Sequence, residues 1–143
     1  MPPKPLKSQV IDLNKKIEGM ASHVKMSAGD AVAETLLMME SDAKMMSPVD
    51  TGRLRSANRG LFDKQKLSGV LFNNVSYAPF QNFGTGSQVK INPGWEATAA
   101  LFKGASEARF SIKGNNFFSN AYDKGIKKLV EKLKKIVDNA TFK

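Results

Sequence analysis

Ser47-Pro48-Val49-Asp50-Thr51-Gly52-Arg53-Leu54-Arg55-Ser56 is the stretch at which a helical pattern stops and a β pattern begins. Pro48 has no amide hydrogen and disfavours helical angles at the residue before it, so a helix arriving from the N-terminal side should end by Ser47. Asp50 can accept hydrogen bonds from the amides that follow it, and Gly52 can adopt the positive φ that a turn often needs. The stretch therefore predicts a turn formed by Pro48, Asp50, Thr51 and Gly52.

Upstream of this turn, apolar residues recur at steps of three and four, which is typical of a helix. The series follows Ser8, a suitable N-cap, and includes Val10, Leu13, Ile17, Met20, Val24, Ala31, Leu36, Met39, Ala43 and Met46. Unbroken from Ser8 to about Met45, this helix would be roughly 57 Å long, which is more than so short a chain can cover. We expect it either to bend at Gly19 or Gly29, or to lay part of its apolar stripe against another subunit, and we favour the second.

The two ends of the chain differ in character. Residues 1–7 contain three prolines and two lysines and predict an extended arm without a packed core. The length of 143 residues suits a single domain, which we place at residues 8–143. Near the C-terminus, the apolar residues from Tyr122 to Ala140 line one face of a second, shorter amphipathic helix, with its lysines mainly elsewhere.

Between these helices the pattern is mostly β. Leu54 to Phe62 and Ser68 to Val75 read as two strands of an antiparallel hairpin joined by Asp63-Lys64-Gln65-Lys66. Arg109 to Lys113 alternates like a third strand, and Tyr77 to Phe83 reads as a short helix that ends at Gly84. We therefore predict an α+β fold in which a long N-terminal helix and a shorter C-terminal helix pack on a small, mostly antiparallel sheet.

The residue types that carry most enzyme chemistry are scarce. The chain has no cysteine and one histidine, His23, so thiolate catalysis and Cys-ligated metal centres are excluded. Asp50-Thr51-Gly52 matches the active-site triplet of aspartic proteases, but that chemistry needs a proton shared between two buried aspartates, and Arg53 and Arg55 would oppose it. Gly84-Thr85-Gly86 lacks the rest of a phosphate-binding or dinucleotide motif. We expect no enzyme activity, no cofactor and no metal.

Positive charge is concentrated in the second half of the chain. The formal net charge is +9, yet residues 1–45 hold six lysines and six acidic residues and are neutral. On a strand over 53–59, the three arginines Arg53, Arg55 and Arg59 would share one face, where they could contact acidic groups of an adjacent subunit or phosphates. A plain solvated strand face explains this row equally well. The charge favours an acidic partner or nucleic acid but specifies neither.

Two motifs together resemble a known family. Pro48-Val49-Asp50-Thr51-Gly52-Arg53-Leu54-Arg55-Ser56 is followed by Val75-Ser76-Tyr77-Ala78-Pro79, which leads to Phe83-Gly84-Thr85-Gly86. Their order and spacing, with a long helix before them and a helix after Phe117-Phe118, are similar to the tail-completion, or head-tail joining, proteins of long-tailed bacteriophages. The chain departs from that family at Gln81-Asn82, where an acidic residue is common, and in the loop from Ser87 to Lys113.

The resemblance implies a structural virion protein with no catalytic role. Copies would form a ring, six-fold or twelve-fold, at the phage neck after assembly in the host cytoplasm. The ring would join the head connector or portal-adaptor proteins to the tail tube or tail terminator protein, with genomic DNA passing through its channel unread. Tyr77, Phe83, Gly84, Thr85 and Gly86 would form its second motif, while Arg53, Arg55 and Arg59 would lie at a subunit interface or in the lumen. No membrane partner is expected.

One alternative comes from the charge alone. A small basic protein that binds duplex DNA as a monomer or dimer would also have this composition. However, the chain shows no helix-turn-helix pattern, and basic and aromatic residues do not interleave on one predicted face. Tight DNA binding that weakens steeply with salt would distinguish this alternative from a neck protein.

Overall fold

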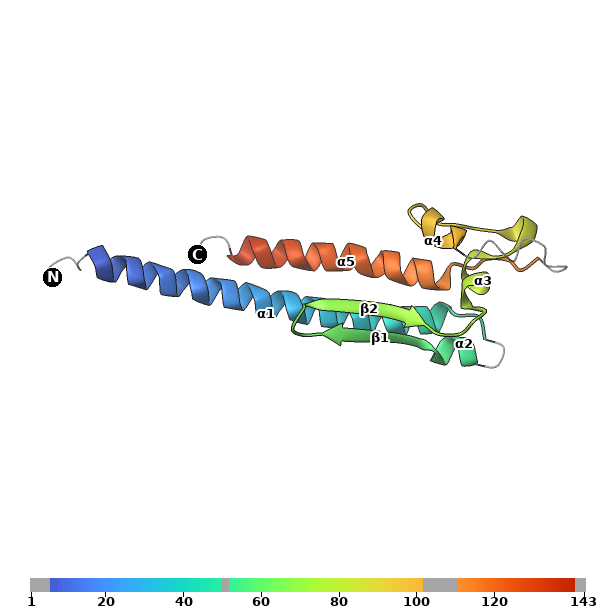
Figure 1. The fold of residues 1–143 in the computed structure, drawn as a ribbon, viewed down its shortest axis with the longest axis horizontal. Helices are drawn as coiled ribbons and strands as arrows, with labels where there is room; N and C mark the ends of the chain where they lie inside the picture. The colour runs from blue at the N-terminus through green and yellow to red at the C-terminus, as the bar shows by residue number, and fades with distance from the viewer. Residues whose placement is uncertain (1–5, 50–51, 102–110, 141–143) are drawn as a thin grey trace.

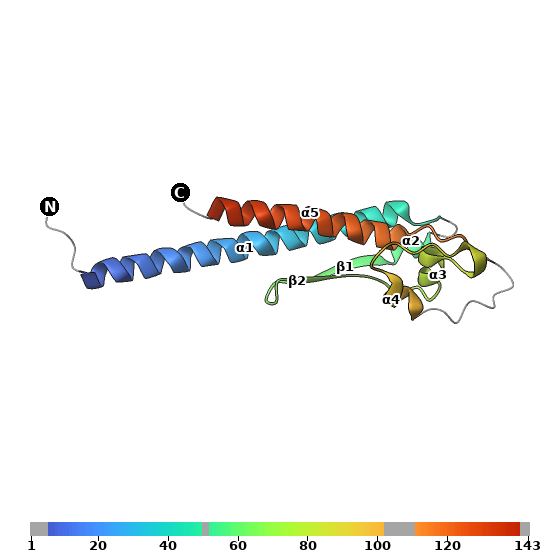
Figure 2. The same ribbon diagram turned by 90° about the horizontal axis from the view of Figure 1, so that it is seen from above.

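Two helices of unequal length lie side by side and run in opposite directions (Figure 1). The computed structural model describes residues 6–49, 52–101 and 111–140. A β-hairpin packs on a different face of α1 from α5, and the short elements gather at the end of the molecule away from both termini (Figures 1 and 2). The elements are α1 Leu6–Met46, α2 Arg53–Ser56, β1 Asn58–Asp63, β2 Ser68–Asn73, α3 Ala78–Phe83, the 3-10 turn η1 Gly86–Gln88, α4 Glu96–Ala100 and α5 Phe117–Ala140. The predicted α+β class is confirmed.

The long helix α1 is continuous, and neither Gly19 nor Gly29 interrupts it. Its 41 residues span about 60 Å. It ends at Met46 as predicted, and the Ser47 amide and hydroxyl both donate to the Ala43 carbonyl, at 3.0 and 2.6 Å. Of the predicted arm over residues 1–7, Leu6 and Lys7 belong to α1, and residues 1–5 lie outside the described residues. The last proline of the arm is Pro5, so nothing in the next two residues prevents helical angles.

Small side chains let α1 and α5 approach closely. Ala43 and Ala121 are fully buried, and a Cβ on Gly125 would lie 2.3 Å from atoms of Met39. Two ion pairs fix the antiparallel register, since Lys124 Nζ lies 3.1 Å from Asp42 and Lys132 Nζ lies 2.9 Å from Glu34. The start of α5 therefore lies beside the end of α1, and the later turns of α5 lie beside earlier turns of α1.

The hairpin packs on another face of α1 through a leucine and two glycines. β1 and β2 pair antiparallel, with Gly60 opposite Leu71 and Phe62 opposite Gly69. A Cβ on Gly60 would come within 2.7 Å of Leu36, and one on Gly69 within 3.1 Å of the same side chain. Leu36 therefore occupies space that two ordinary residues would fill. As predicted, the polar link closes the hairpin: the Asp63 carboxylate accepts from two amides of the turn.

Glu40 also joins α1 to the hairpin, and its charge makes the joint dependent on pH. Its carboxylate accepts from Lys44 Nζ and, at 2.8 Å, from the Gly60 amide. The hydrogen bond from Lys44, then that from Gly60, and then the charges of Lys44 and Arg59 lower the pKa of Glu40. Since the folded pKa lies below the unfolded one, this stabilisation is present at neutral pH and is lost as the pH falls through the folded pKa.

We predict that Glu40→Gln lowers the free energy of unfolding by about 1 kcal/mol at neutral pH and by less in acid. The amide introduced by this substitution can still accept from the Gly60 amide but carries no charge. Urea unfolding of both proteins from neutral to acidic pH measures the difference. Glu131→Gln, at an exposed position of α5, is the matched control and should not change this pH dependence. A constant gap between Glu40→Gln and the parent protein across pH would contradict the prediction.

Two parts of the predicted strands differ in the described residues: the start of the first strand and the end of the third. Residues 53–56 form the helical turn α2 and not the start of a strand, and β1 begins only at Asn58. The Asn58 amide group donates to the Leu54 and Arg55 carbonyls, at 3.3 and 3.2 Å, and so satisfies groups that a strand would have paired. Residues 111–113 are not a strand either, and residues 102–110 lie outside the described ranges.

Candidate functional site

The first motif surrounds a buried hydrogen-bond centre at Asn58. Asn58 has no exposed surface; its Nδ2 donates to Ser47 Oγ at 2.8 Å, and its Oδ1 accepts from Asn73 Nδ2 at 3.0 Å. The end of α1, the turn α2 and both strands therefore meet at one side chain. Gly52 has φ 76°, as predicted for this turn, and Pro48 follows the end of α1. Asp50 and Thr51 lie outside the described residues.

The predicted arginine row does not form. Arg53 and Arg55 are two positions apart on the helical turn α2, which turns their side chains to nearly opposite sides. Arg59 lies on β1, on the face turned away from α1, close enough to Glu40 to lower the pKa of that carboxyl. All three arginines are exposed. They can still contact an anionic partner, but as separate charges at one end of the molecule.

The second motif is a place where two segments of backbone touch. Gly84 has φ 84°, and a Cβ there would lie 2.5 Å from the Gln88 carbonyl oxygen and 2.6 Å from the Gly114 amide nitrogen. Thr85 joins the same two segments: its amide donates to the Ile112 carbonyl at 2.8 Å, and its hydroxyl accepts from the Ile112 amide at 2.7 Å. Gly84 ends α3, as predicted.

The remaining residues of this motif lie around the close contact between the backbones of Gly84 and Gly114. Tyr77 is the N-cap residue of α3, Phe83 is buried at its end, and Gly86 opens η1 with φ 59°. The motif thus has a clear structural role in the described residues. It holds the loop after α3 against the segment that leads into α5.

Asn82, at the departure from the family pattern, caps α5 from another part of the chain. Its Oδ1 accepts from the Phe118 amide at 2.9 Å and from the Ser119 amide at 3.2 Å, and its Nδ2 donates to Ser119 Oγ at 2.7 Å. These amides belong to the first turn of α5, which has no intrahelical partners for them. A carboxylate at this position could accept from the same two amides.

Trp95 forms an aromatic cluster that the sequence pattern did not predict. Its ring meets Tyr122 edge-on at 5.4 Å and Phe118 at 6.2 Å, and it lies 6.3 Å from Phe83. Its Nε1 donates to Asp123 at 2.9 Å. The region from α3 to α4 is thus anchored to the start of α5. The only available signal was that a single tryptophan stands in a stretch without periodicity.

The N-terminal part of α1 projects past the C-terminal end of α5 (Figures 1 and 2). Every residue from 11 to 23 is exposed. Ile11, Leu13, Ile17 and Met20 are all about half exposed, at 54%, 56%, 54% and 48%. We call residues 11–24 the α1 overhang. Apolar groups of this size normally pack against something, so the overhang is a candidate interface.

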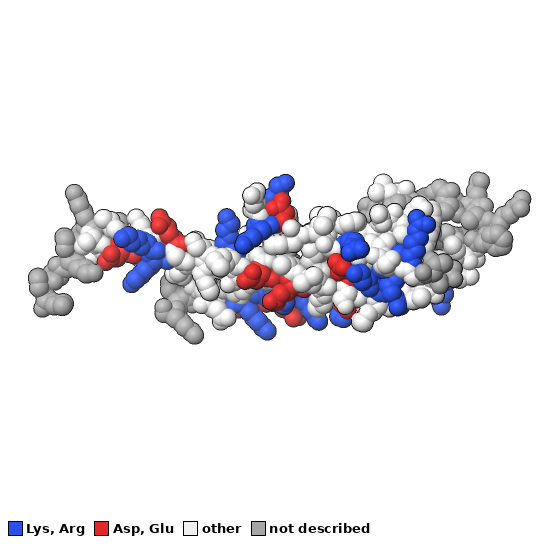
Figure 3. All heavy atoms as spheres, turned by 90° about the horizontal axis from the view of Figure 1, so that it is seen from below, with Lys and Arg blue, Asp and Glu red and all other residues white. Residues whose placement is uncertain are grey.

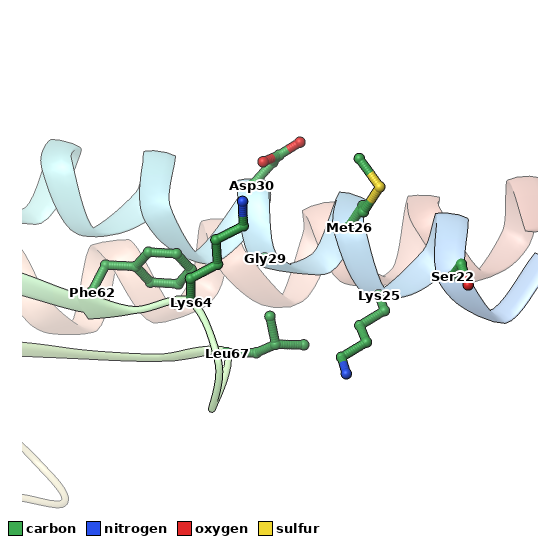
Figure 4. Close-up of a pocket in the computed structure, with 8 residues that line it drawn as sticks. All are labelled: Ser22, Lys25, Met26, Gly29, Asp30, Phe62, Lys64 and Leu67. Carbon is green, nitrogen blue, oxygen red and sulfur yellow. The ribbon is translucent and has the colours of Figure 1, made fainter.

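A second candidate is a pocket between α1 and the tip of the hairpin, of about 450 Å³ (Figure 4). Met26, Phe62 and Leu67 supply its apolar wall, with Gly29 on α1 between them. Lys25 and Lys64 lie at its rim, together with Ser22 and Asp30. The pocket is suited to receive an apolar side chain of a partner, with lysines available to an adjacent carboxylate.

Other surfaces carry less information. On the face that Figure 3 shows, acidic side chains lie among the basic ones, and no broad basic field is seen there. The described residues contain no cluster of three or more histidine and acidic side chains that could hold a metal ion. Within the described ranges, no helix is both long and apolar enough to span a bilayer.

Comparison of the chain with protein-family models, curated proteins and solved structures finds no match. The resemblance to tail-completion proteins therefore stays a prediction. Among the described residues, the α1 overhang and the pocket beside the hairpin are the features that could contact a partner.

Proposed function

We propose that this chain is a structural protein of a tailed-phage neck, where copies form a ring that completes the tail end and joins it to the head connector. It has no catalytic step. The observation that carries the self-assembly part is the α1 overhang, in which half-exposed apolar side chains continue beyond the point where α5 ends. The neck assignment itself depends on the two motifs of the resemblance.

The placement of the motifs suggests that the two ends of the molecule have different roles. Both motifs lie at the end away from the termini, close to α2 and α3 (Figure 1). In the described residues, both motifs are held by buried hydrogen bonds and close backbone contacts, which fix the shape of this end of the molecule. The opposite end exposes the overhang. In a ring, one end would then present a fixed surface to head or tail proteins while the other contributes contacts between copies.

The distribution of charged side chains is consistent with a channel through which DNA passes without sequence recognition. Basic residues outnumber acidic ones overall, yet on the face in Figure 3 they alternate with carboxylates. Such a surface attracts phosphates weakly and without sequence preference. A dedicated duplex-binding protein would need a continuous basic face. An electrophoretic shift with duplex DNA over a salt series tests this: tight binding that weakens steeply with salt would contradict the neck proposal.

The direct test uses phage particles that lack this protein. Purified protein should restore the joining of heads to tails, and imaging should show a ring at the neck. Mass measurement in solution gives the number of copies. A protein that remains monomeric at high concentration and is absent from the neck of assembled particles would overturn the proposal.

The arginines give a sharper prediction. Replacing Arg53, Arg55 and Arg59 with serine should reduce ring assembly or head-tail joining at least about tenfold while changing the free energy of unfolding by no more than about 1 kcal/mol, since all three are exposed. Lys127, Lys134 and Lys135 of α5 are also exposed, and their replacement with serine removes the same charge. Equal losses in both triple variants would indicate a general charge effect, and no loss in the arginine variant would refute their role.

A further inference from the structure

We propose that the α1 overhang of one copy packs on α5 of a second copy, and that the second copy does the same in return, with the two α1 helices antiparallel. This inference rests on the self-association part of the proposed function and names the two surfaces that meet. It predicts that copies come in pairs, which a six-fold or twelve-fold ring allows.

The most apolar face of α5 is not the face that packs on α1. Toward α1 the helix turns a glycine and two lysines, namely Gly125, Lys128 and Lys132. Its large apolar side chains form a separate row, which we call the α5 stripe: Tyr122, Ile126, Val130 and Leu133. About a third of a turn separates the two rows, because each residue of a helix is rotated by about 100° from the one before. The α5 stripe is therefore available to another partner.

Most of the α5 stripe is uncovered in the described part of the chain. Tyr122, Ile126 and Val130 are 38%, 36% and 44% exposed. Trp95 lies edge-on against Tyr122 at the start of the stripe. Of the described helices and strands, only α1 and α3 make more than marginal contact with α5, and α3 lies near its start (Figure 1). An amphipathic helix normally buries such a row of side chains.

The α1 overhang exposes the face of α1 that binds α5 farther along the helix. Seven-residue steps lead from Ile17 through Val24 and Ala31 to Met38, whose sulfur accepts from Lys128 of α5. Seven residues are nearly two full turns, so these side chains share one face. In the overhang this face carries a row that we call the overhang stripe: Leu13, Ile17, Met20 and Val24. An α5 helix is thus the element that this face of α1 already binds within the chain.

The two stripes match in length and character. The overhang stripe runs from Leu13 to Val24 and the α5 stripe from Tyr122 to Leu133, so each extends over eleven residue steps, or about 16 Å. Neither row contains a charged side chain, so their contact buries no charge. Because the copies are identical, a reciprocal pair forms this contact twice. One second copy therefore covers both exposed rows of the first.

The unbroken length of α1 determines the direction of the partner. Beyond the overhang, α1 continues to Met46 and carries its own α5 and hairpin. With the N-terminal end of the overhang toward Leu133, this continuation would run into Trp95 and α4 at the start of the other copy's α5. With that end toward Tyr122, the continuation passes the C-terminal end of α5, where α1 is the only described element alongside (Figures 1 and 2). Only the second direction is open.

This direction makes the contact reciprocal. The partner's α1 then runs in the direction of the first copy's α5, and α5 runs opposite to its own α1. The two α1 helices are therefore antiparallel and related by a two-fold axis. The continuation of the partner's α1 lies beside the first copy's overhang and brings its own α5 to the overhang stripe. A parallel copy on the same face is excluded, because its α1 would enter the space that α5 occupies.

The first test uses two variants of the full-length protein that should fail alone and associate when mixed. Ile17→Asp alters the overhang stripe and Ile126→Lys alters the α5 stripe. Each alone should weaken self-association, measured by sedimentation over a concentration series, by about a hundredfold or more, because both contacts of a pair are altered. In a mixed pair one contact is intact, and the other holds both substitutions, whose charges are opposite. The equimolar mixture should therefore associate at least about tenfold more tightly than either variant.

Two control variants place the same charges on the opposite sides of the two helices. Lys15→Asp lies across α1 from the overhang stripe, and Glu131→Lys lies across α5 from the α5 stripe; both residues are exposed. Both controls should associate like the parent protein. If Ile17→Asp or Ile126→Lys alone associated like the parent, or if their mixture associated no better than either variant, the proposed contact would be wrong.

The second test determines direction with spin labels, since the chain has no cysteine. Asp12→Cys and Ser22→Cys are made and labelled separately, at exposed positions about 15 Å apart along α1. In the antiparallel pair, the two labels at residue 12 should be farther apart than the two labels at residue 22 by about 15 Å or more, because residue 12 is farther from the two-fold axis. Electron paramagnetic resonance measures both separations. Equal separations would indicate parallel helices and overturn the proposal.

The pairing and the neck function can fail separately. If mixing the two variants restores association but the parent protein is absent from the neck of assembled particles, the pairing holds and the neck function is wrong. If mixing does not restore association while the parent protein forms a ring at the neck and joins heads to tails, the function holds and the pairing is wrong.

Discussion

Gly84→Ala is expected to destabilise the protein by about 4 kcal/mol, which would lower the melting temperature by more than about 10 °C. Two costs add at this residue. Its φ of 84° is unfavourable for a residue with a side chain. The new Cβ would also meet three backbone atoms within 2.8 Å, which cannot move aside as a flexible side chain would. Thermal unfolding followed by circular dichroism measures the loss.

Gly94 separates the two costs. Its φ of 91° is similar, but a Cβ there would have nothing within 4 Å. Gly94→Ala should therefore cost only about 1 kcal/mol, from backbone strain alone. If both variants lost the same stability, the close approach of Gly84 to Gly114 would not be what holds this loop. Gly114→Ala, whose Cβ would lie 2.5 Å from Phe83 backbone atoms, should behave like Gly84→Ala.

The helices were predictable because their signals are local and repeated. The three-and-four spacing from Leu13 onward predicts α1, and Pro48 sets its end, since a proline restricts the residue before it whatever the surroundings. Gly84 ends α3 because it adopts a positive φ, which a glycine does without strain. The hairpin was also predictable from the sequence, because its polar turn separates two apolar runs.

The errors arose where distant residues decide a local conformation. Leu54 between two arginines alternates like a strand, but hydrogen bonds from Asn58 to the Leu54 and Arg55 carbonyls favour a helical turn. The segment before α5 alternates in the same way, yet Ile112 pairs with Thr85 of a loop and not with a strand. Thr85 lies 27 residues from Ile112 and is invisible in a local window, whereas Asn58 is only three to four residues from the carbonyls that it binds but is held in place by Ser47 and Asn73, which are 11 and 15 residues away.

The motifs that carry the resemblance are, in the described residues, supports of the fold. Gly84 allows a backbone crossing, Asn58 joins four elements, and Asn82 caps α5. Motifs of this kind specify a shape and say little about what the shape binds. The proposed function therefore depends on exposed surfaces, the α1 overhang above all, where single substitutions can change assembly without unfolding the domain.

Asn58 is the residue at which the first motif can be tested most directly. Asn58→Ala should lower the free energy of unfolding by about 3 kcal/mol, because Ser47 Oγ, the Leu54 carbonyl and Asn73 Nδ2 all lose a partner in a site without solvent. Urea unfolding at neutral pH gives the value. Asn74→Ala, one residue beyond β2 and exposed, is the control and should change it by less than about 0.5 kcal/mol.

Asn58→Asp distinguishes lost hydrogen bonds from lost volume, since it keeps the shape of the side chain. A carboxylate cannot donate to Ser47 Oγ or to the Leu54 and Arg55 carbonyls, and it would place an unpaired charge among their oxygens. We therefore expect it to be more destabilising than Asn58→Ala at neutral pH, and less so in acid, where a protonated carboxyl can donate again. If Asn58→Asp were as stable as the parent protein at neutral pH, the donor role of Asn58 in holding α1, α2 and the hairpin together would be wrong.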